Sequence, residues 1–208
     1  GFLKTIFTIG YSCFEIDDFI KVLKQYAINC VVDVRSSPNS MYFTDYNIGN
    51  LKPLLEKNGI IYRNYQKEFG ARQEDPQFYD KGYLEFCQFT QSEQFLEGVR
   101  KIEAGMERGF IFALMCAEKD PATCHRNIMV ARAFHKKGYK IANILFDGTI
   151  ETQERLEERL VDCYFPERDQ LSLFQEPLSW EEMVERSYRL RNSEIGYRLD
   201  QEGGNDHA

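Results

Sequence analysis

The stretch FIFALMCAEKDPATCHR, residues 110–126, decides the fold class of this 208-residue chain. Its first part, Phe110–Met115, is a continuous apolar run, which is typical of a central strand covered on both faces. Asp120 and Pro121 are residue types favoured at the start of a helix, and the following pattern predicts a helix over Pro121–Lys137. A buried strand that leads directly into a helix indicates an α/β protein.

The same alternation of strand and helix signals extends over residues 1–150. Short apolar runs predict further strands at Thr5–Ile9, Cys30–Val34, Ile60–Tyr62 and Lys140–Phe146. Apolar residues at helical spacing predict helices at Glu15–Tyr26, Ile48–Asn58, Tyr83–Gln88 and Gln94–Met106. Strands that alternate with helices form mostly parallel sheets. We therefore expect a three-layer, Rossmann-like α/β fold, without a dinucleotide fingerprint because the chain contains no G-x-G-x-x-G.

Charge divides the chain into two parts. The formal net charge is −7, but residues 1–150 hold 19 basic and 18 acidic side chains, whereas residues 151–208 hold 7 basic and 15 acidic ones. Beyond Thr149 the pattern predicts helices only. We expect an α/β domain over 1–150 and an acidic helical extension over 151–208 that packs on it.

Two local signals describe this extension further. Ser179–Glu182 is a capping-box signature for a helix that runs to about Arg191. The last residues, 203–208, are polar and are expected to be disordered.

Composition excludes several classes of protein. A hydrophobic content of 43% and an aromatic content of 14% exclude an intrinsically disordered protein. The six cysteines are too sparse for a disulfide scaffold, no signal segment is visible and no apolar run approaches the length of a membrane span. We expect a reduced, soluble, cytoplasmic protein that makes no membrane contact. The acidic total argues against general nucleic-acid binding, while self-association into a homo-oligomer stays open.

Ligands in open α/β sheets bind outside the carboxyl ends of the strands. The polar residues that follow the predicted strands therefore converge on one edge of the sheet, and they form the candidate site. They are Ser12, Asp33, Arg35, Ser40, Arg72, Cys116, Glu118, Cys124, His125 and Arg126.

Four segments of the chain resemble the bacterial and archaeal family called domain of unknown function 488. They are TIGYS at 8–12, VVDVRSSPNS at 31–40, GIIYRNYQKEFGAR at 59–72 and LMCAEKDPATCHR at 114–126. The chain has Phe69–Ala71 where the family tends to carry Leu-Gly-Gly, which would alter the approach of a ligand to that backbone. The residues after about 165 are not covered. The resemblance implies a fold and a site, but no particular chemistry.

The cysteines suggest thiol chemistry. Cys116 ends the buried strand, and Cys124, His125 and Arg126 fall in the first turns of the predicted helix, whose N-terminus favours anions and thiolates. Cysteine phosphatases and sulfurtransferases likewise place a thiolate near an arginine at a strand-to-helix turn. They carry Cys-x5-Arg, however, whereas nine residues separate Cys116 from Arg126. Simple burial of each cysteine, or a redox pair of Cys116 with Cys124, are the alternatives.

Two residues are candidates for acid–base roles. His125 is the one histidine placed to act near neutral pH in this site, and its alternative is a histidine on the helix surface. Glu118 is a candidate general acid or base, or else a loop carboxylate in water.

The remaining candidates suit an anion. Asp33 and Arg35 point to the same face of their strand, so Asp33 would orient Arg35 toward a phosphate or carboxylate. The alternative is a salt-bridged strand end. Ser12 and Ser40 would donate to the same anion, and Arg72 would join them or remain solvated in its loop.

No metal site is expected, because neighbouring helical residues such as Cys124 and His125 rarely bind one ion. No motif indicates a cofactor. The leading hypothesis is an enzyme with cysteine-dependent, transferase-like or hydrolase-like chemistry on a small anionic substrate, phosphorylated or nucleotide-like. The alternative is a non-catalytic ligand-binding or nucleic-acid-associated module that uses the same pocket.

Overall fold

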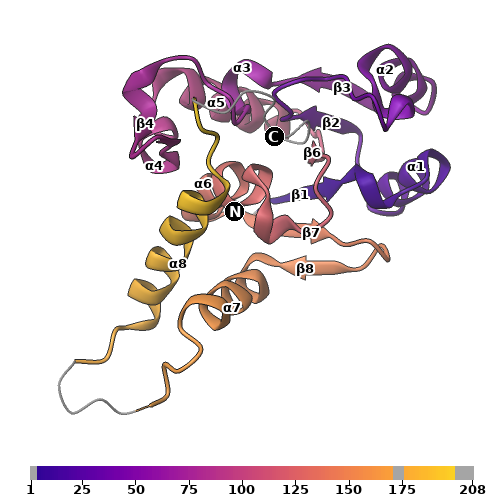
Figure 1. Ribbon diagram of the computed structural model, residues 1–208. Helices are drawn as coiled ribbons and strands as arrows, with labels where there is room; N and C mark the ends of the chain where they lie inside the picture. The colour runs from indigo at the N-terminus through magenta and orange to yellow at the C-terminus, as the bar shows by residue number, and fades with distance from the viewer. Residues whose placement is uncertain (1–3, 171–175, 200–208) are drawn as a thin grey trace.

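A computed structural model describes residues 4–170 and 176–199 of the chain (Figure 1). A six-stranded sheet with the order β3-β2-β6-β1-β7-β8 lies at its centre, and its first five strands are parallel. The strands are β1 Thr5–Gly10, β2 Cys30–Asp33, β3 Ile61–Asn64, β6 Phe112–Cys116, β7 Lys140–Ile144 and β8 Ile150–Thr152. The mostly parallel sheet predicted from the sequence is confirmed.

Helices of different lengths connect the strands. They are α1 Ile16–Gln25, α2 Ile48–Lys57, α3 Gln66–Phe69, α4 Phe86–Phe89, α5 Glu93–Glu107, α6 Arg132–Lys136, α7 Gln153–Tyr164 and α8 Trp180–Ile195. A small hairpin, β4 Tyr79–Asp80 and β5 Tyr83–Leu84, precedes α4. Among residues 4–170 and 176–199, every helix is too short or too polar to serve as a membrane span.

The sheet is covered on both faces, which gives the three expected layers (Figure 1). The two faces of β6 separate cleanly, since Ala113 and Met115 join the core cluster of α1 and α2, while Leu114 faces the opposite cluster. That second cluster contains side chains of α5, α6 and α7. Because β6 lies between β2 and β1, both of its faces are buried, as its continuous apolar sequence predicts.

The helix predicted over Pro121–Lys137 is divided into three pieces. Pro121–Thr123 forms a 3₁₀ turn capped by the Asp120 side chain, Arg126–Ala131 is π-helical, and α6 completes the segment. Cys124 has an extended backbone conformation, so it precedes the helix and does not lie in its first turn. The break turns Cys124 back toward the end of β6.

Two further predictions were wrong in part. Residues 83 and 84 belong to β5, which pairs with β4 across a turn of Lys81 and Gly82 with positive φ, so only the second half of the predicted 83–88 helix forms. The chain beyond Thr149 is not purely helical, because β8 pairs antiparallel with β7. A three-residue strand carries no periodicity, although Asp147–Gly148 before it is a typical hairpin-turn pair.

The helix predicted from the capping box is present as α8. The Ser179 hydroxyl accepts a hydrogen bond from the Glu182 backbone N–H at 3.2 Å, and the helix ends at Ile195, later than predicted. The end expected to be disordered, 203–208, lies outside the described residues.

A network of buried polar side chains joins the C-terminal helices to the sheet. The Asn127 Nδ2 group donates to Asn143 Oδ1 of β7 at 2.9 Å and to Gln153 Oε1 of α7 at 2.7 Å. Gln153 Nε2 in turn donates to the Tyr188 hydroxyl of α8 at 2.8 Å, and that hydroxyl donates to Glu157 Oε2 at 2.8 Å. Because buried polar groups are costly when unpaired, the network fixes α7 and α8 against the α/β body.

We expect Tyr188→Phe to lower the free energy of unfolding by about 1–3 kcal/mol, because it removes one buried hydrogen bond from the Gln153 amide and one from the Glu157 carboxylate. Tyr42→Phe is the matched control, since Tyr42 is 79% exposed. Urea unfolding followed by circular dichroism measures both, and the wild-type chain should unfold in one transition. Equal effects of the two substitutions would contradict the role of the network.

Candidate functional site

Polar side chains meet at the carboxyl ends of three neighbouring strands. β2, β6 and β1 are adjacent in the sheet, and they end at Asp33, Cys116 and Gly10 respectively. The segment after β6 returns over this edge, because the Ser12 backbone N–H donates to the Ala117 carbonyl at 3.1 Å. The sheet edge predicted to hold the site thus brings together residues from three distant parts of the sequence.

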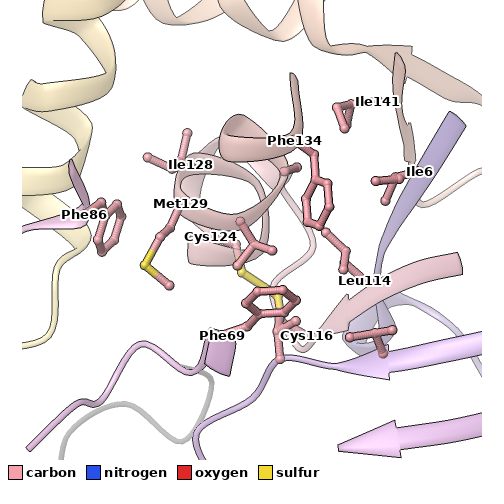
Figure 2. Packing of buried hydrophobic residues seen from close by; sticks show 14 of the residues in the cluster. Ile6, Phe69, Phe86, Leu114, Cys116, Cys124, Ile128, Met129, Phe134 and Ile141 are labelled. Carbon is pink, nitrogen blue, oxygen red and sulfur yellow. A yellow bond between two sulfur atoms is a disulfide. The ribbon is translucent and has the colours of Figure 1, made fainter. Parts of the chain in front are cut away.

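Cys116 and Cys124 pair with each other at the end of β6. Their sulfur atoms are joined as a disulfide across eight positions of sequence, with Cα atoms 7.8 Å apart (Figure 2). The other four cysteines are free, and the expectation that the protein is reduced stays a prediction. The pairing matches the redox alternative and needs no Cys-x2-Cys motif, because the fold supplies the proximity.

Both sulfur atoms lie in an apolar environment. Cys116 is fully buried and Cys124 is 2% exposed, and they pack with Phe69, Leu114 and Met129 in the core cluster (Figure 2). Burial, the structural alternative for each cysteine, is thus what the structure shows. A reagent reaches either sulfur only if this part of the fold opens.

Arg126 is the polar neighbour of the sulfur pair. Its Nη1 group donates to Cys116 Sγ at 3.1 Å and to the Glu118 carbonyl at 2.6 Å, and its backbone N–H donates to Cys124 Sγ at 3.4 Å. The side chain is fully buried and forms no ion pair with any described residue. Burial lowers the pKa of the Arg126 guanidinium to about 10, because the charged form loses its hydration.

Three further donors in this region are buried without a hydrogen-bond partner among the described residues. Two belong to Arg126, namely Nε and Nη2, and the third is Nη1 of Arg35. The hydroxyl of Tyr11, which is also fully buried, likewise has no hydrogen-bond partner among the described residues. Buried donors are nearly always paired in folded proteins, so a group of unpaired ones is a signal of a missing acceptor.

Gly10 allows the guanidinium groups of Arg126 and Arg35 to lie close to the turn that follows β1. A Cβ atom on Gly10 would lie 1.7 Å from the Glu118 carbonyl oxygen and 3.1 Å from Nη1 of Arg126. The next residue, Tyr11, lies under the Arg35 guanidinium, whose carbon is 5.2 Å from the ring centroid. Only glycine permits the backbone after β6 to approach β1 this closely.

Asp33 holds Arg35 in place. Its two carboxylate oxygens accept from Arg35 Nε at 2.9 Å and from Nη2 at 2.8 Å, and both side chains are buried. The Tyr62 hydroxyl also donates to Asp33 Oδ2. Asp33 and Arg35 therefore share one face, as predicted. Burial, the largest single effect, lowers the pKa of Arg35, but the hydrogen bonds and charge of Asp33 and the effect of Tyr11 together raise it above its ordinary value.

The role of His125 as a group that acts near neutral pH stays a prediction, and the surroundings of the ring weigh against it. His125 is 4% exposed, and burial, the largest effect, lowers its pKa to about 4. Its Nε2 atom lies 2.7 Å from the Val34 carbonyl, which can only accept, so Nε2 carries the proton of the neutral ring. The Nδ1 lone pair then faces Cys124 Sγ at 3.9 Å. The surface-histidine alternative is wrong.

The other predicted residues have different surroundings. Ser40 accepts hydrogen bonds from the backbone N–H groups of Tyr42 and Phe43, at 3.2 and 3.3 Å, and so shapes the loop after β2. Glu118 contacts Arg126 through its backbone carbonyl. Arg72 is half-buried and lies over the Tyr197 ring at 5.4 Å, so it is not simply solvated. Their roles toward a ligand stay predictions.

The sequence places Gly10, Tyr11 and Cys13 at this edge of the sheet, after the first strand, but it gives no reason to assign them a role in the site. All three lie at the end of β1 or in the 3₁₀ turn Tyr11–Cys13 that follows it. Burial raises the pKa of the half-buried Cys13 thiol, while the positive charge of Arg126 acts in the opposite direction. Their position directly after a predicted strand indicates that they lie at the site, but their residue types are not specific to ligand binding.

The described residues include no group of three or more His, Cys, Asp or Glu side chains arranged to hold a metal ion. The unpaired groups are guanidinium and phenol donors, which bind anions and not cations. The donor set therefore fits the oxygen atoms of an anionic group.

The comparison with known protein families gives one match. Residues 15–133, more than half of the chain, match the family model described as domain of unknown function DUF488. The chain belongs to this family. The family match includes every predicted site residue except Ser12. No curated protein and no solved structure matches the chain at a significant level.

We expect Gly10→Ala to destabilise this DUF488 protein by several kcal/mol, or to prevent its folding, because the added methyl group would overlap the Glu118 carbonyl. Gly49→Ala is the matched control, since nothing lies within 4 Å of its added Cβ and Gly49 is in helix α2. That control should be neutral or more stable, by up to about 1 kcal/mol. Thermal unfolding compares the two, and similar melting temperatures would contradict the close approach at Gly10.

The neutral state of His125 predicts a pH dependence of stability. Its folded pKa of about 4 lies below its ordinary value of 6.5, so the unfolded chain binds the extra proton first. The stabilisation is fully present above pH 6.5 and is lost as the pH falls toward 4, by roughly 3 kcal/mol. His125→Asn should flatten this slope in urea unfolding at pH 4.5–7. An unchanged slope, or a His125 ring resonance that titrates near pH 6.5 by NMR, would contradict this assignment.

Proposed function

We propose that the chain is an enzyme that binds a small substrate through an oxyanion, such as a phosphate group, at Arg126 and Arg35. The observation that carries the proposal is the set of buried donors without partners: Arg126 Nε and Nη2, Arg35 Nη1 and the Tyr11 hydroxyl. An oxyanion has several acceptor oxygens and matches the planar fork of a guanidinium group.

The charge balance supports the same assignment. Asp33 neutralises Arg35, whereas the Arg126 guanidinium has no carboxylate in hydrogen-bond contact among the described residues. The buried region thus carries one positive charge that no carboxylate contacts directly, although Asp120 and Glu118 act on it from farther away. Burying a cation without a counter-ion is costly, and a bound anion would remove that cost.

The sulfur pair supplies the proposed chemistry. Reduction by an external thiol, such as glutathione, converts the Cys116–Cys124 disulfide to two thiols and oxidises two molecules of the reductant. Arg126 Nη1, 3.1 Å from Cys116 Sγ, would stabilise a Cys116 thiolate. His125 Nδ1, 3.9 Å from Cys124 Sγ, would accept a hydrogen bond from the second thiol. Such a thiolate suits transferase-like or hydrolase-like reactions.

A specific observation favours the alternative, a non-catalytic module that binds its ligand at the same place. Both sulfur atoms are buried and paired with each other, which suits a structural role better than a nucleophile. A nucleic-acid-associated module would use the same arginines on a backbone phosphate. The two functions differ in what happens after the anion is bound, and this difference can be measured.

Inorganic phosphate tests the anion site. We expect phosphate to raise the melting temperature of the wild-type chain and to bind in isothermal titration calorimetry, with sodium chloride at equal ionic strength as the salt control. Arg126→Met should abolish the response, since it removes the guanidinium group. Arg108→Met is the matched control, because Arg108 is exposed and should leave the response unchanged. A response that survives Arg126→Met would overturn the proposal.

The same preparations test the thiol chemistry. Under reducing conditions, with a panel of phosphorylated metabolites and nucleotides, turnover that Cys116→Ser abolishes supports the enzyme. Binding without turnover, unaffected by Cys116→Ser and by Cys124→Ser, favours the non-catalytic module.

A further inference from the structure

A pocket opens beside the arginine site and is not used by the proposed oxyanion contacts. It has a volume of about 420 Å³ and lies between the residues that follow β1 and the segment 42–46 before α2. Ser12 and Cys13 form one side, while Tyr42, Phe43 and Tyr46 form the other. This volume falls within the range of small-molecule sites in proteins, about 300–1,000 Å³.

Aromatic side chains line one part of this pocket, and two of them pack against the buried Tyr11 ring. Tyr46 stacks on the buried Tyr11 ring, with centroids 4.4 Å apart and planes inclined by 19°, and its hydroxyl donates to the Phe14 carbonyl at 2.7 Å. Phe43 meets Tyr11 edge-on at 5.6 Å. Tyr42 is 79% exposed at the rim. A flat ring entering the pocket would thus lie against a packed aromatic cluster, beside the exposed side chain of Tyr42.

The charge of the pocket is negative. Glu15, Asp18 and Asp45 line it, and the lining includes no Lys, Arg or His. None of the three carboxylates forms an ion pair with a described residue. Carboxylates accept hydrogen bonds only, so they favour a ligand group that presents N–H donors and disfavour one that presents oxygen acceptors.

The pocket and the arginine site are neighbours. Ser12 and Cys13 line the pocket and directly follow Gly10 and Tyr11, which border the two guanidinium groups. The charge of Arg126 also acts on the Cys13 thiol, which lies in the pocket wall. A ligand seated in the pocket would therefore have carboxylate acceptors beside aromatic side chains, and its other end would reach the buried guanidinium groups past the wall formed by Ser12 and Cys13.

We infer that this pocket binds an amino-bearing heterocyclic base, and that the ligand of the chain is a nucleoside monophosphate whose phosphate group is held by Arg126. The inference rests on the proposed function for its phosphate end only. The carboxylates select bases that carry an exocyclic amino group, because that group donates where the carbonyl of the corresponding unaminated base would accept. The aromatic walls contribute stacking that every base can make.

CMP and UMP form a matched pair of ligands for this inference, because cytosine carries an amino group where uracil carries a carbonyl oxygen. We expect CMP to bind about fivefold to tenfold more tightly than UMP in isothermal titration calorimetry. Inorganic phosphate reports the arginine site alone. Phosphocholine, a cation linked to phosphate without a flat ring, should bind more weakly than CMP.

Variants of the carboxylates locate the preference. The double variant Asp18→Asn, Asp45→Asn should bring the affinities for CMP and UMP to within about twofold of each other, because each amide offers a donor as well as an acceptor. Asp17→Asn is the matched control, since Asp17 is exposed on the same helix but does not line the pocket. Phosphate binding should be unchanged in both variants.

The outcomes separate the two proposals. If phosphate binds through Arg126 but CMP and UMP bind equally, the base pocket is wrong and the oxyanion site stands. The base pocket is also wrong if phosphocholine binds more tightly than CMP, or if the preference for CMP survives the double variant. A preference for CMP that the double variant removes, without phosphate binding at Arg126, would support the pocket and overturn the oxyanion site.

Discussion

A guanidinium group buried without a carboxylate is the constraint around which this fold is arranged. Arg126 reaches back from the π-helical segment to the end of β6, where it donates to Cys116 and to the Glu118 carbonyl. That carbonyl lies so close to β1 that only Gly10 fits beside it. The parallel strands, the glycine and the broken helix together bury the positive charge of Arg126. Burial of a charge is costly unless another group compensates for it.

The sequence contained enough information for the architecture and for the location of the candidate site. The apolar run that becomes β6 predicts a strand buried on both faces, and the parallel arrangement then brings residues such as Asp33 and Arg126 to one edge. These predictions succeed because they depend on local hydrophobic pattern and on general topology. The three-residue strand β8 carries too little pattern to be recognised, and the break at Cys124 arises from tertiary contacts.

The protonation and bonding of each site residue were harder to predict from the sequence, because they depend on neighbours that are far away along the chain. His125 titrates well below neutrality since the fold buries it against the Val34 carbonyl, and no local signal announces this. The unpaired donors of Arg126 and Arg35 result from the way several distant segments pack around them. The pairing of Cys116 with Cys124 likewise cannot be deduced from spacing alone.

The two edges of the sheet affect how copies of the chain meet in solution. An exposed, long edge strand is a template for aggregation, because its free N–H and C=O groups pair readily with another chain. Here one edge is the three-residue, antiparallel β8, whose last residue, Thr152, also caps α7. The other edge, β3, has four residues and ends in the exposed Arg63 and Asn64. Short edges that end in polar side chains discourage the growth of the sheet from one molecule into the next.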